Sequence, residues 1–488
     1  MKYLLSIILT WLCIIKIMAA EISAPIIMPT PQKCDLLGGT CLVSDTKIVK
    51  RINQADVPAE GYRLKIDRKG VTIWCSDESG YIYAQQTLKV LQMQYADIGR
   101  IPNIMVNDAP RVRWRSFMLD SGRQYQRIST IKKYIDMMSM LKFNRFHWHL
   151  TEGLGWRLEI KRYPKLTSVG AFVGGGAEQR GYYSQEDVRE IVAYAKKRAI
   201  TVLPEIDMPG HAEAALNAYP HLGCFGQIPV VPKEGFTEHI FCAGKPVTIA
   251  FLKNVIDELC ELFPSEYIHL GGDEAPKGNW DKCPDCRRQI KDIGLKDSHD
   301  LQLWFAAEMA KYLKKKGRKA IFWGDVVYKE GYPLPDNVVI HWWNWRGHKD
   351  LAYQNAIKGR HSVIAGTNNY TYLNFPVSPW RGYKEDRTFD IQDIYKANPS
   401  YVKHSSPLLI GMSASLWTDY NVTENMIDKR VFPRIFALAQ QMWSRGEDPG
   451  FEQFYSEVKR IQPLFEKLGY EFGPGLRSEV TDTYNWEI

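Results

Sequence analysis

Beyond residue 109, apolar runs of strand length alternate with amphipathic stretches of helix length. Buried strands joined by helical crossovers are typical of an α/β fold in which the strands run parallel and close into a (β/α)₈ TIM barrel. We therefore predict such a barrel over residues 109–488, completed by C-terminal helices. The predicted strands span residues 116–120, 143–149, 201–207, 267–273, 320–325, 338–343, 362–367 and 408–417, and the predicted helices span 128–141, 184–198, 247–262, 299–316 and 428–443.

Residues 21–108 have a different pattern of apolar and polar positions. Short alternating runs at 62–66 and 71–74 are followed by a helical pattern at 79–95. This order predicts a small α/β domain in which a helix covers one face of a sheet. No group of polar residues in it suggests chemistry, so we expect it to act as a scaffold.

Residues 1–20 have the pattern of a secretory signal peptide. A basic Lys2 precedes an uncharged apolar run, and small residues end the segment at Ala19 and Ala20. The run is short for a membrane span, and no later stretch is long and apolar enough for one. We expect an exported protein, periplasmic or secreted, without a stable membrane span. Lys16 leaves the cleavage position open, and a retained anchor is the alternative.

Charge and composition narrow the class of partner. The formal net charge of +8 is spread along the chain without a Lys/Arg block, which argues against nucleic-acid binding. Aromatic residues make up 12% of the chain, with 15 Trp and 26 Tyr. Such rings often stack on sugar faces, although packing in the interior can absorb many of them.

Eight cysteines follow the predicted signal, which contains Cys13. Cys34 and Cys41 flank two glycines, a spacing suited to a disulfide-closed loop, and Cys224 and Cys242 could close a longer one. A zinc site at Cys283 and Cys286 would need two more ligands, and the chain has no second Cys-x-x-Cys. A local disulfide or a pair of free thiols is therefore favoured there, and Cys75 and Cys260 lie in apolar patterns typical of a core.

An acidic pair, Asp273 and Glu274, ends the predicted strand 267–273. If strand geometry persists, adjacent carboxylates point to opposite faces and can differ in environment. One can then have a raised pKa and donate a proton while the other stays ionised and stabilises positive charge. The alternative is that the pair lies in the first turn of a helix, where acids are common.

Polar and aromatic residues also stand at the C-terminal ends of nearly all the remaining predicted strands. Strand C-terminal ends meet at one face of a TIM barrel, so these residues are expected to surround one site. Acids, an Arg and several Trp suit a polyhydroxylated ring, whose apolar face stacks on aromatics while its hydroxyls bind charged groups. The residues at these ends are Asp120, Arg123, Glu152, Glu205, Asp207, His211, Trp323, Asp325, Trp343, Tyr372, Asn374, Trp417 and Asp419.

Four motifs identify a family resemblance. They are Leu-Asp-x-x-Arg at 119–123, His-Trp-His-Leu-Thr at 147–151, Pro-Glu-Ile-Asp-Met-Pro-Gly-His at 204–211 and His-Leu-Gly-Gly-Asp-Glu at 269–274. With these motifs in this order, the chain resembles a family-20 glycoside hydrolase, a β-N-acetylhexosaminidase, from about residue 21 to its C-terminal helices. The resemblance implies a small α/β domain before a (β/α)₈ barrel, which agrees with the pattern above.

The resemblance implies substrate-assisted hydrolysis with retention, an exception to the usual two-carboxylate scheme. The 2-acetamido oxygen of the substrate attacks its own anomeric carbon and gives an oxazolinium intermediate. Asp273 would orient the acetamido nitrogen and stabilise the positive charge, and Glu274 would act as general acid and then base. Tyr372 would donate to the acetamido oxygen, and His211 would link an upstream acid to Glu274.

Substrate-binding residues follow from the same resemblance. Arg123 and Asp419 would hold ring hydroxyls, and Trp323, Trp343 and Trp417 would wall the acetamido pocket. Each has a structural alternative: Arg123 as an ion-pair partner of Asp120, and Trp417 as part of the core. Trp343 is preferred to its neighbours Trp342 and Trp345, and His147, Trp148 and His149 are expected to pack inside the barrel.

Two positions depart from the family pattern. The upstream acid is usually Asp, whereas this chain has Glu152. Many members have Tyr-x-Asp, whose Asp accepts from the sugar 6-hydroxyl, whereas this chain has Asn374, with Arg381 and Lys384 nearby. An amide lacks the charge that would repel a 6-O-sulfate, so 6-sulfated N-acetylglucosamine is one hypothesis; the other is an ordinary hydrogen bond to the hydroxyl.

The expected substrates are glycans with a terminal β-linked N-acetylhexosamine, chiefly GlcNAc, with GalNAc left open. A related exo-glycosidase acting on disaccharide units or chitin fragments is one alternative, and a secreted glycan-binding protein on a catalytically weak barrel is another. Retention of Asp273, Glu274 and Tyr372 favours an enzyme. A metal-dependent hydrolase lacks a convincing ligand set, and no cofactor or metal is expected. Linkage and oligomeric state are not specified by the sequence.

Overall fold

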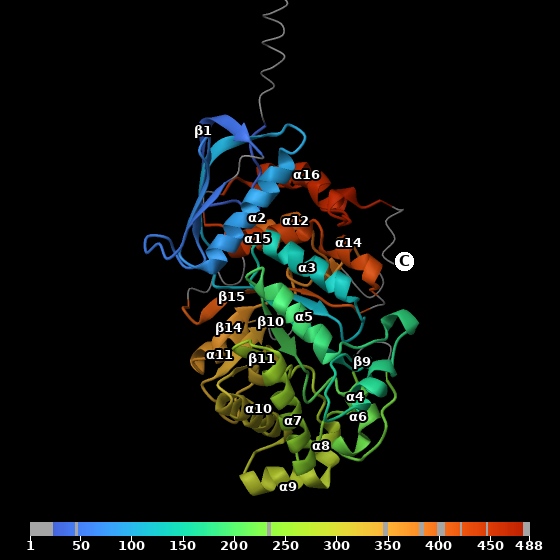
Figure 1. Cartoon of the computed structure of the whole chain (residues 1–488). Coiled ribbons are helices and arrows are strands. Elements are labelled where there is room, and N and C mark those ends of the chain that lie inside the picture. The colour runs from blue at the N-terminus through green and yellow to red at the C-terminus, as the bar shows by residue number, and fades with distance from the viewer. Residues whose placement is uncertain are drawn as a thin grey trace, which may run out of the picture.

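A computed structural model of the chain describes residues 23–43, 47–231, 236–344, 350–379, 385–397, 406–419, 422–445 and 448–481. The predicted signal peptide therefore lies outside the described residues. Figure 1 shows a small sheet-and-helix domain, in blue, stacked on one end of a larger barrel. Within the described part of the chain, no helix is long and apolar enough to cross a membrane.

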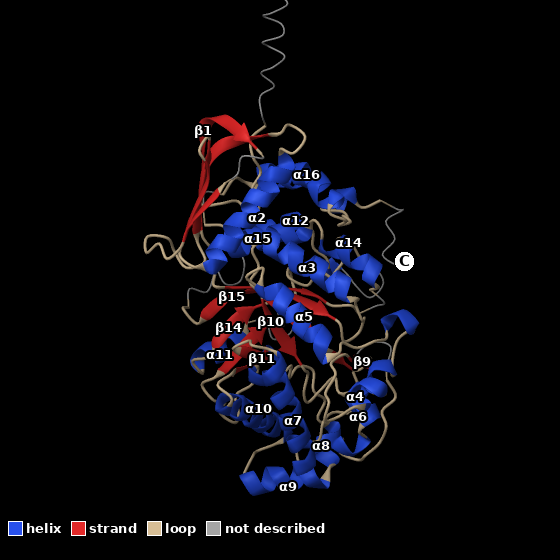
Figure 2. Cartoon of the chain, in the orientation of Figure 1, coloured by secondary structure: helices blue, strands red, loops and turns tan. Residues whose placement is uncertain are grey.

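The larger domain is a closed barrel of parallel strands, as predicted. Its strands have buried, mostly apolar side chains on both faces, because neighbours fill the lumen and helices cover the outside. Figure 2 shows the red strands at the centre of a layer of blue helices. In order around the barrel the strands are β6 (Trp114–Asp120), β7 (Arg145–His149), β10 (Thr201–Glu205), β11 (Tyr267–His269), β12 (Lys319–Trp323), β13 (Val338–Trp342), β14 (Ser362–Ala365) and β15 (Leu409–Leu416).

Helices connect these strands, and most begin and end near the predicted positions. The predicted helix at 428–443 is instead two helices, because Pro433 cannot supply the N–H that a continuous helix needs at this point. A short hairpin of β8 (Thr151–Glu152) and β9 (Gly155–Trp156) follows β7. The helices of this domain are α3 (Ile128–Met140), α4 (Lys165–Ser168), α5 (Gln185–Lys196), α6 (Glu213–Ala218), α7 (Pro246–Leu262), α8 (Gly278–Lys282), α9 (Pro284–Ile293), α10 (Ser298–Lys315), α11 (Leu351–Lys358), α12 (Ile391–Lys396), α14 (Ile427–Val431), α15 (Arg434–Trp443) and α16 (Phe451–Lys467).

The small domain is the predicted sheet with one covering helix. Alternate residues of its central strand, Tyr62, Leu64 and Ile66, are fully buried, and the helix begins at Asp77, whose side chain caps the Gly80 amide. Along the sheet the strands are β1 (Lys33–Leu42), β5 (Arg100–Asp108), β3 (Tyr62–Asp67), β4 (Gly70–Cys75) and β2 (Ile48–Arg51), and the helix is α2 (Glu78–Gln94).

Buried charges join the two domains. Asp108, the last residue of β5, accepts a hydrogen bond from the Trp443 indole at 2.8 Å and lies 3.4 Å from the Lys142 ammonium. Glu60 pairs with Arg115 at 2.8 Å. Lys142 and Arg115 lie at the start of β7 and β6, so the small domain covers the N-terminal ends of these strands. The opposite end of the barrel stays accessible for a site.

The small sheet corrects one disulfide prediction. Cys34 and Cys41 lie on β1, opposite Val106 and Ile101 of β5. Five residues of extended strand separate the two partner positions, which corresponds to about 17 Å. That is far beyond the reach of a disulfide, so the glycines between the two cysteines form a bulge in the strand rather than a closed loop.

Candidate active site

A cavity of about 440 Å³ opens where the barrel strands end. Of the residues to which the family resemblance gives a catalytic or substrate-binding role, all but His211 and Trp323 line it. This position agrees with the general location of active sites in TIM barrels. The lining residues are Arg123, Asp273, Glu274, Trp343, Asn344, Asn368, Tyr372, Asn374, Phe375, Arg387, Trp417 and Asp419.

The acidic pair reaches the cavity by a turn and not by a continuing strand. Strand β11 ends at His269, so the prediction of a strand to residue 273 is wrong. Gly271, Gly272 and Glu274 have φ values of 64°, 97° and 43°. Glycine adopts such left-handed values without strain, whereas Glu274 adopts them at a cost in free energy. The two carboxylates are therefore placed by a turn of the backbone and not by the alternation of a strand.

Close packing explains the glycine at position 271. A Cβ there would lie 1.7 Å from Oδ1 of Asp207, and the same oxygen accepts the Gly272 amide at 3.0 Å. Asp207 follows the end of β10, so it fixes the turn that leads to Asp273. Burial, with the nearby Glu205 carboxylate, raises the pKa of Asp207 well above its ordinary value.

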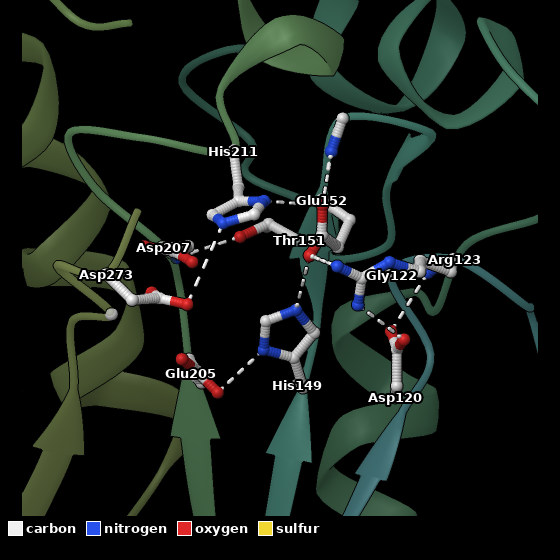
Figure 3. Close-up of polar contacts among 12 residues, drawn as sticks. Asp120, Gly122, Arg123, His149, Thr151, Glu152, Glu205, Asp207, His211 and Asp273 are labelled. Atoms are coloured by element: carbon white, nitrogen blue, oxygen red, sulfur yellow. Dashed lines mark hydrogen bonds and ion pairs between the residues drawn. The ribbon is translucent and has the colours of Figure 1, made fainter. Parts of the chain in front are cut away.

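His211 lies between Asp273 and Glu152 (Figure 3). Its Nδ1 is 3.0 Å from Oε2 of Glu152, and its Nε2 is 3.7 Å from both Oδ2 of Asp273 and Oε2 of Glu274. Burial alone would lower the pKa of His211, but the Glu152 carboxylate outweighs it and raises that pKa to about 10. A charged imidazole thus stands beside both acids.

Glu152 is held by charged and neutral donors on several sides. Arg123 Nη2 lies 2.5 Å from its Oε1, and the Gly153 amide donates to its Oε2 at 2.9 Å. Burial opposes its charge, yet Arg123 and His211 keep the pKa of Glu152 well below the usual range. Arg123 also binds Asp120 at 2.9 Å, so the structural role and the pocket position that the sequence left as alternatives occur together.

The two acids differ in exposure. The Asp273 side chain is 11% exposed and that of Glu274 is 39% exposed. Burial, with the Asp207 charge, raises the pKa of Asp273 well above its ordinary value, and burial also raises the pKa of Glu274. Glu274 can therefore hold a proton at the cavity surface, whereas Asp273 lies deeper, where a cationic ligand would favour its ionised form.

Aromatic rings wall the cavity beside these acids. Trp343 and Tyr372 stack with their planes 13° apart and ring centroids 6.2 Å apart, and Trp417 lies 5.9 Å from Tyr372. Asp325 fixes Trp343 by accepting its indole N–H at 2.5 Å. Burial raises the pKa of Tyr372 well above its usual value, so its hydroxyl remains a donor. Of the neighbouring tryptophans, Trp342 is fully buried and packs against Tyr353 of α11. Trp345 is not among the described residues.

Comparisons with known proteins agree with this arrangement. Residues 112–446 match the family described as "Glycosyl hydrolase family 20, catalytic domain", and residues 42–109 match "Glycosyl hydrolase family 20, domain 2". The chain belongs to glycosyl hydrolase family 20. The predicted fold is confirmed, as is the predicted class of enzyme, a glycoside hydrolase of the β-N-acetylhexosaminidase type.

Individual relatives of this family-20 chain are named beta-hexosaminidase or beta-N-acetylhexosaminidase. It is 37% identical to a beta-hexosaminidase of Porphyromonas gingivalis over 81% of this chain, but it spans only 52% of that protein. It is 33% identical to a beta-hexosaminidase of Akkermansia muciniphila, with 94% of each chain covered. A crystal structure of beta-N-acetylhexosaminidase from Bacteroides fragilis is 55% identical, with a TM-score of 0.90 over 95% of this chain and 100% of that one.

One predicted wall residue of the family-20 site lies elsewhere. Trp323 is 1% exposed and lies below the cavity, where its indole donates to Glu205 at 2.7 Å and its ring stacks on His341. Its ring centroid is 5.7 Å from that of Trp417, so it supports a wall residue from behind. The prediction overlooked that Trp323 still belongs to β12, whose side chains fill the barrel interior.

His147 and His149 pack inside the barrel, as predicted, but the sequence did not predict that Glu205 lies among them. Its carboxylate lies 2.7 Å from His147, 2.6 Å from His149 and 3.1 Å from His269, all inside the barrel. Burial lowers the pKa of His147 to about 4, whereas the Glu205 charge overcomes burial and raises the pKa of His149 well above its usual value. The spacing of polar residues in the motif at 204–211 was the available signal.

Proposed function

We propose that this family-20 protein is a retaining exo-β-N-acetylhexosaminidase that releases terminal β-linked GlcNAc by substrate assistance. The observation that carries the proposal is the shared histidine: Asp273 and Glu274 face one cavity, and His211 lies 3.7 Å from both. The cavity volume suits one sugar ring, and aromatic walls surround the deeper acid.

In the first step the acetamido oxygen of the substrate forms a bond to C1, and the bond from C1 to the leaving oxygen breaks. Glu274 gives its proton to that oxygen. Asp273 accepts the acetamido N–H and stabilises the positive charge of the oxazolinium ion. The Tyr372 hydroxyl donates to the acetamido oxygen, and Trp343 and Trp417 exclude water from the pocket.

In the second step water attacks C1 from the side that the leaving group occupied. Glu274, now ionised, takes a proton from this water, and the C1 bond to the acetamido oxygen breaks. The sugar is released with its configuration retained, and Glu274 regains its acidic form. The positive charge on His211 limits the rise in the pKa of Glu274, which keeps that group able to act in both directions.

The residues that the family resemblance associates with the sugar 6-hydroxyl support a finer proposal. Asn374 lines the cavity and donates to Asp419 at 3.0 Å, and Arg387 lines the same cavity. An amide and a guanidinium present no negative charge to a 6-O-sulfate, so 6-O-sulfo-GlcNAc is a second substrate in this proposal. Arg381 and Lys384, which suggested the same idea, lie outside the described residues. GalNAc, whose 4-hydroxyl is inverted, is the further candidate substrate.

The proposed site of action is outside the cytoplasm, in the periplasm or beyond. The composition of residues 1–20 supports export. Export would bring the enzyme to polymeric glycans outside the cytoplasm. Export is tested by the N-terminal sequence of protein recovered from extracytoplasmic fractions. A chain that keeps residues 1–20 and stays with the cytoplasm would overturn it.

Hydrolysis of a chromogenic β-N-acetylglucosaminide by the full-length chain tests the main proposal. We expect turnover that Glu274→Gln reduces by about two orders of magnitude or more. A thiazoline mimic of the cyclised intermediate should inhibit competitively, and a trifluoroacetamido substrate should react more slowly because its carbonyl oxygen is a weaker nucleophile. Equal rates for acetamido and trifluoroacetamido substrates would overturn substrate assistance, and no turnover by a folded chain would favour a glycan-binding protein.

A further inference from the structure

Four cysteines from two strand-to-helix connections meet beside the active site. Cys224 and Cys242 lie between α6 and α7, and Cys283 and Cys286 lie at the start of α9. All four sulfur atoms lie within 4.8 Å of one another. Cys242, Cys283 and Cys286 are fully buried, and Cys224 is partly buried.

Of the two alternatives left open for Cys283 and Cys286, the structure has free thiols and not a local disulfide. The two further sulfur atoms that a metal site there needs belong to Cys224 and Cys242, which lie about 40 to 60 residues earlier and have no Cys-x-x-Cys spacing. Cys224 and Cys242 are likewise not joined in a disulfide of their own, and all four thiols are free. We propose that the four sulfurs bind one zinc ion as a structural Cys₄ site.

The distances between sulfur atoms fit a tetrahedron around a metal ion. They are 3.9 Å for Cys224 to Cys286, 3.8 Å for Cys242 to Cys283 and 3.5 Å for Cys242 to Cys286. A zinc–sulfur bond of about 2.3 Å in tetrahedral geometry gives sulfur atoms about 3.8 Å apart. Cys242 is close to two partners at once, which a set of isolated disulfides would not require.

The surrounding backbone brings the two connections into direct contact. A Cβ on Gly244 would lie 2.3 Å from the Cys286 nitrogen, so only glycine permits this approach. The Cys242 amide donates to the Leu222 carbonyl at 2.9 Å, which places Cys242 beside Cys224. Cys283 occupies the N-cap position of α9, so the start of this helix fixes where its sulfur lies.

The donor set indicates which metal and which role. Four thiolates without an oxygen ligand favour zinc or iron over magnesium and calcium, and zinc is the usual occupant of an isolated Cys₄ site. Four protein ligands leave no open position for water or substrate. The zinc is therefore structural, and the proposal does not depend on the proposed function.

The site would connect two loops to the active-site histidine. The Phe241 amide donates to the Pro209 carbonyl at 2.9 Å, and Phe241 in turn accepts the Trp280 indole N–H at 3.0 Å. From the same connection Phe236 places its ring 5.7 Å from that of His211. Figure 1 shows α8 and α9 at the end of the barrel away from the small domain. Zinc would thus fix one side of the cavity rim.

Metal analysis of the purified full-length chain, grown with added zinc, tests the proposal directly. We expect about one zinc per chain in the wild type and in Cys260→Ser, a control whose thiol lies outside the cluster. Cys283→Ser/Cys286→Ser should bind none and should unfold at lower temperature. Iron in place of zinc, or no metal in the folded wild type, would overturn the assignment.

Two measurements on the wild type keep the test valid if the double variant does not fold. Cobalt(II) exchanged into the chain should give the intense visible bands of a tetrahedral thiolate complex, independent of activity. Intact mass under denaturing, non-reducing conditions should equal that of the fully reduced chain. A mass lower by the hydrogens of one or two disulfides among these cysteines would overturn the zinc site and favour cross-linking by oxidation.

Discussion

Glu152 and His211 form a buried ion pair, with Nδ1 of the imidazole 3.0 Å from Oε2 of the carboxylate. Glu152 stands where the family resemblance leads one to expect Asp. Its longer side chain still reaches the histidine, because the short β8–β9 hairpin places it and Arg123 fixes its other oxygen. This pair sets the charge next to Asp273 and Glu274, and its removal should therefore be visible in the pH dependence of activity.

We expect Glu152→Gln to move both limbs of the pH profile of kcat/KM upward by about one pH unit. Without the carboxylate, the pKa of His211 falls from about 10 and the imidazole is neutral over more of the working range. A charged His211 lowers the pKa of Asp273 and of Glu274, so its loss raises both. Glu152→Asp, which keeps the charge, is the control. Coinciding profiles for Gln and wild type would show that the pair does not tune the acids.

Gly271→Ala should lower kcat by more than the strain of an alanine at positive φ can explain. The new Cβ would lie 1.7 Å from Oδ1 of Asp207 and would push apart the turn before Asp273. Gly317→Ala is the matched control, because Gly317 has a similar φ of 70° and open space around it. The strain itself costs about 1 to 2 kcal/mol in both variants. We expect kcat to fall about a hundredfold only in Gly271→Ala; equal kcat values would contradict the packing argument.

Tyr372→Phe should lower kcat about a hundredfold and leave KM nearly unchanged. The hydroxyl stabilises charge that appears on the acetamido oxygen only as the ring closes, whereas the ring stacked on Trp343 remains. Steady-state kinetics and the inhibition constant of the thiazoline mimic would be measured together. A rise in KM at constant kcat would assign Tyr372 to ground-state binding instead.

Asn374→Asp should reduce the preference for a 6-sulfated over an unsulfated chromogenic substrate at least about tenfold. The new carboxylate would repel the sulfate and would also lie close to Asp419, which now accepts the Asn374 amide. Arg387→Ala is the companion variant, since its guanidinium lines the same cavity. The ratio of kcat/KM for the two substrates is the readout, and an unchanged ratio in both variants would end the sulfate hypothesis.

Glu205→Gln should destabilise the barrel by about 3 to 5 kcal/mol, because three buried histidines lose a charged partner. Glu205 raises the pKa of His149 well above its usual value. That contribution is fully present below the unfolded pKa of about 6.5 and is lost as pH rises through the folded pKa. The pKa of Glu205 itself is lowered, so its contribution persists down to about pH 4.5. Urea unfolding should show the largest difference between pH 5 and about 6.5; a pH-independent difference would contradict it.

The barrel was readable from the sequence because each strand is an apolar run followed by a polar strand end. Asp273, Glu274, Tyr372 and Arg123 were expected at strand ends and received their roles from the family resemblance, and the cavity brings them together. What the pattern could not give was the backbone path after His269, where positive φ angles end the strand early. Periodicity reports side-chain burial and carries no information on such turns.

Long-range pairings were the other failure. Cysteine spacing suggested that Cys34 would join Cys41, but an extended strand separates them, while Cys283 and Cys286 meet partners from another connection. Trp323 was assigned to the cavity wall from the family resemblance, although its side chain points inward to Glu205. In each case the outcome depended on which residues are neighbours in the folded structure. A single sequence gives only the spacing of residues along the chain, which does not show such neighbours.

The charges shared by the two domains have a consequence for how the chain can be divided. A fragment that begins at residue 112, where the catalytic match starts, would lack Asp108 and Glu60. Lys142, which is 1% exposed in the whole chain, would lose its carboxylate partner, and the Trp443 indole would lose its acceptor. The barrel thus depends on the small domain for the partners of its buried polar groups. A truncated or recombined form of this enzyme should therefore keep both domains together.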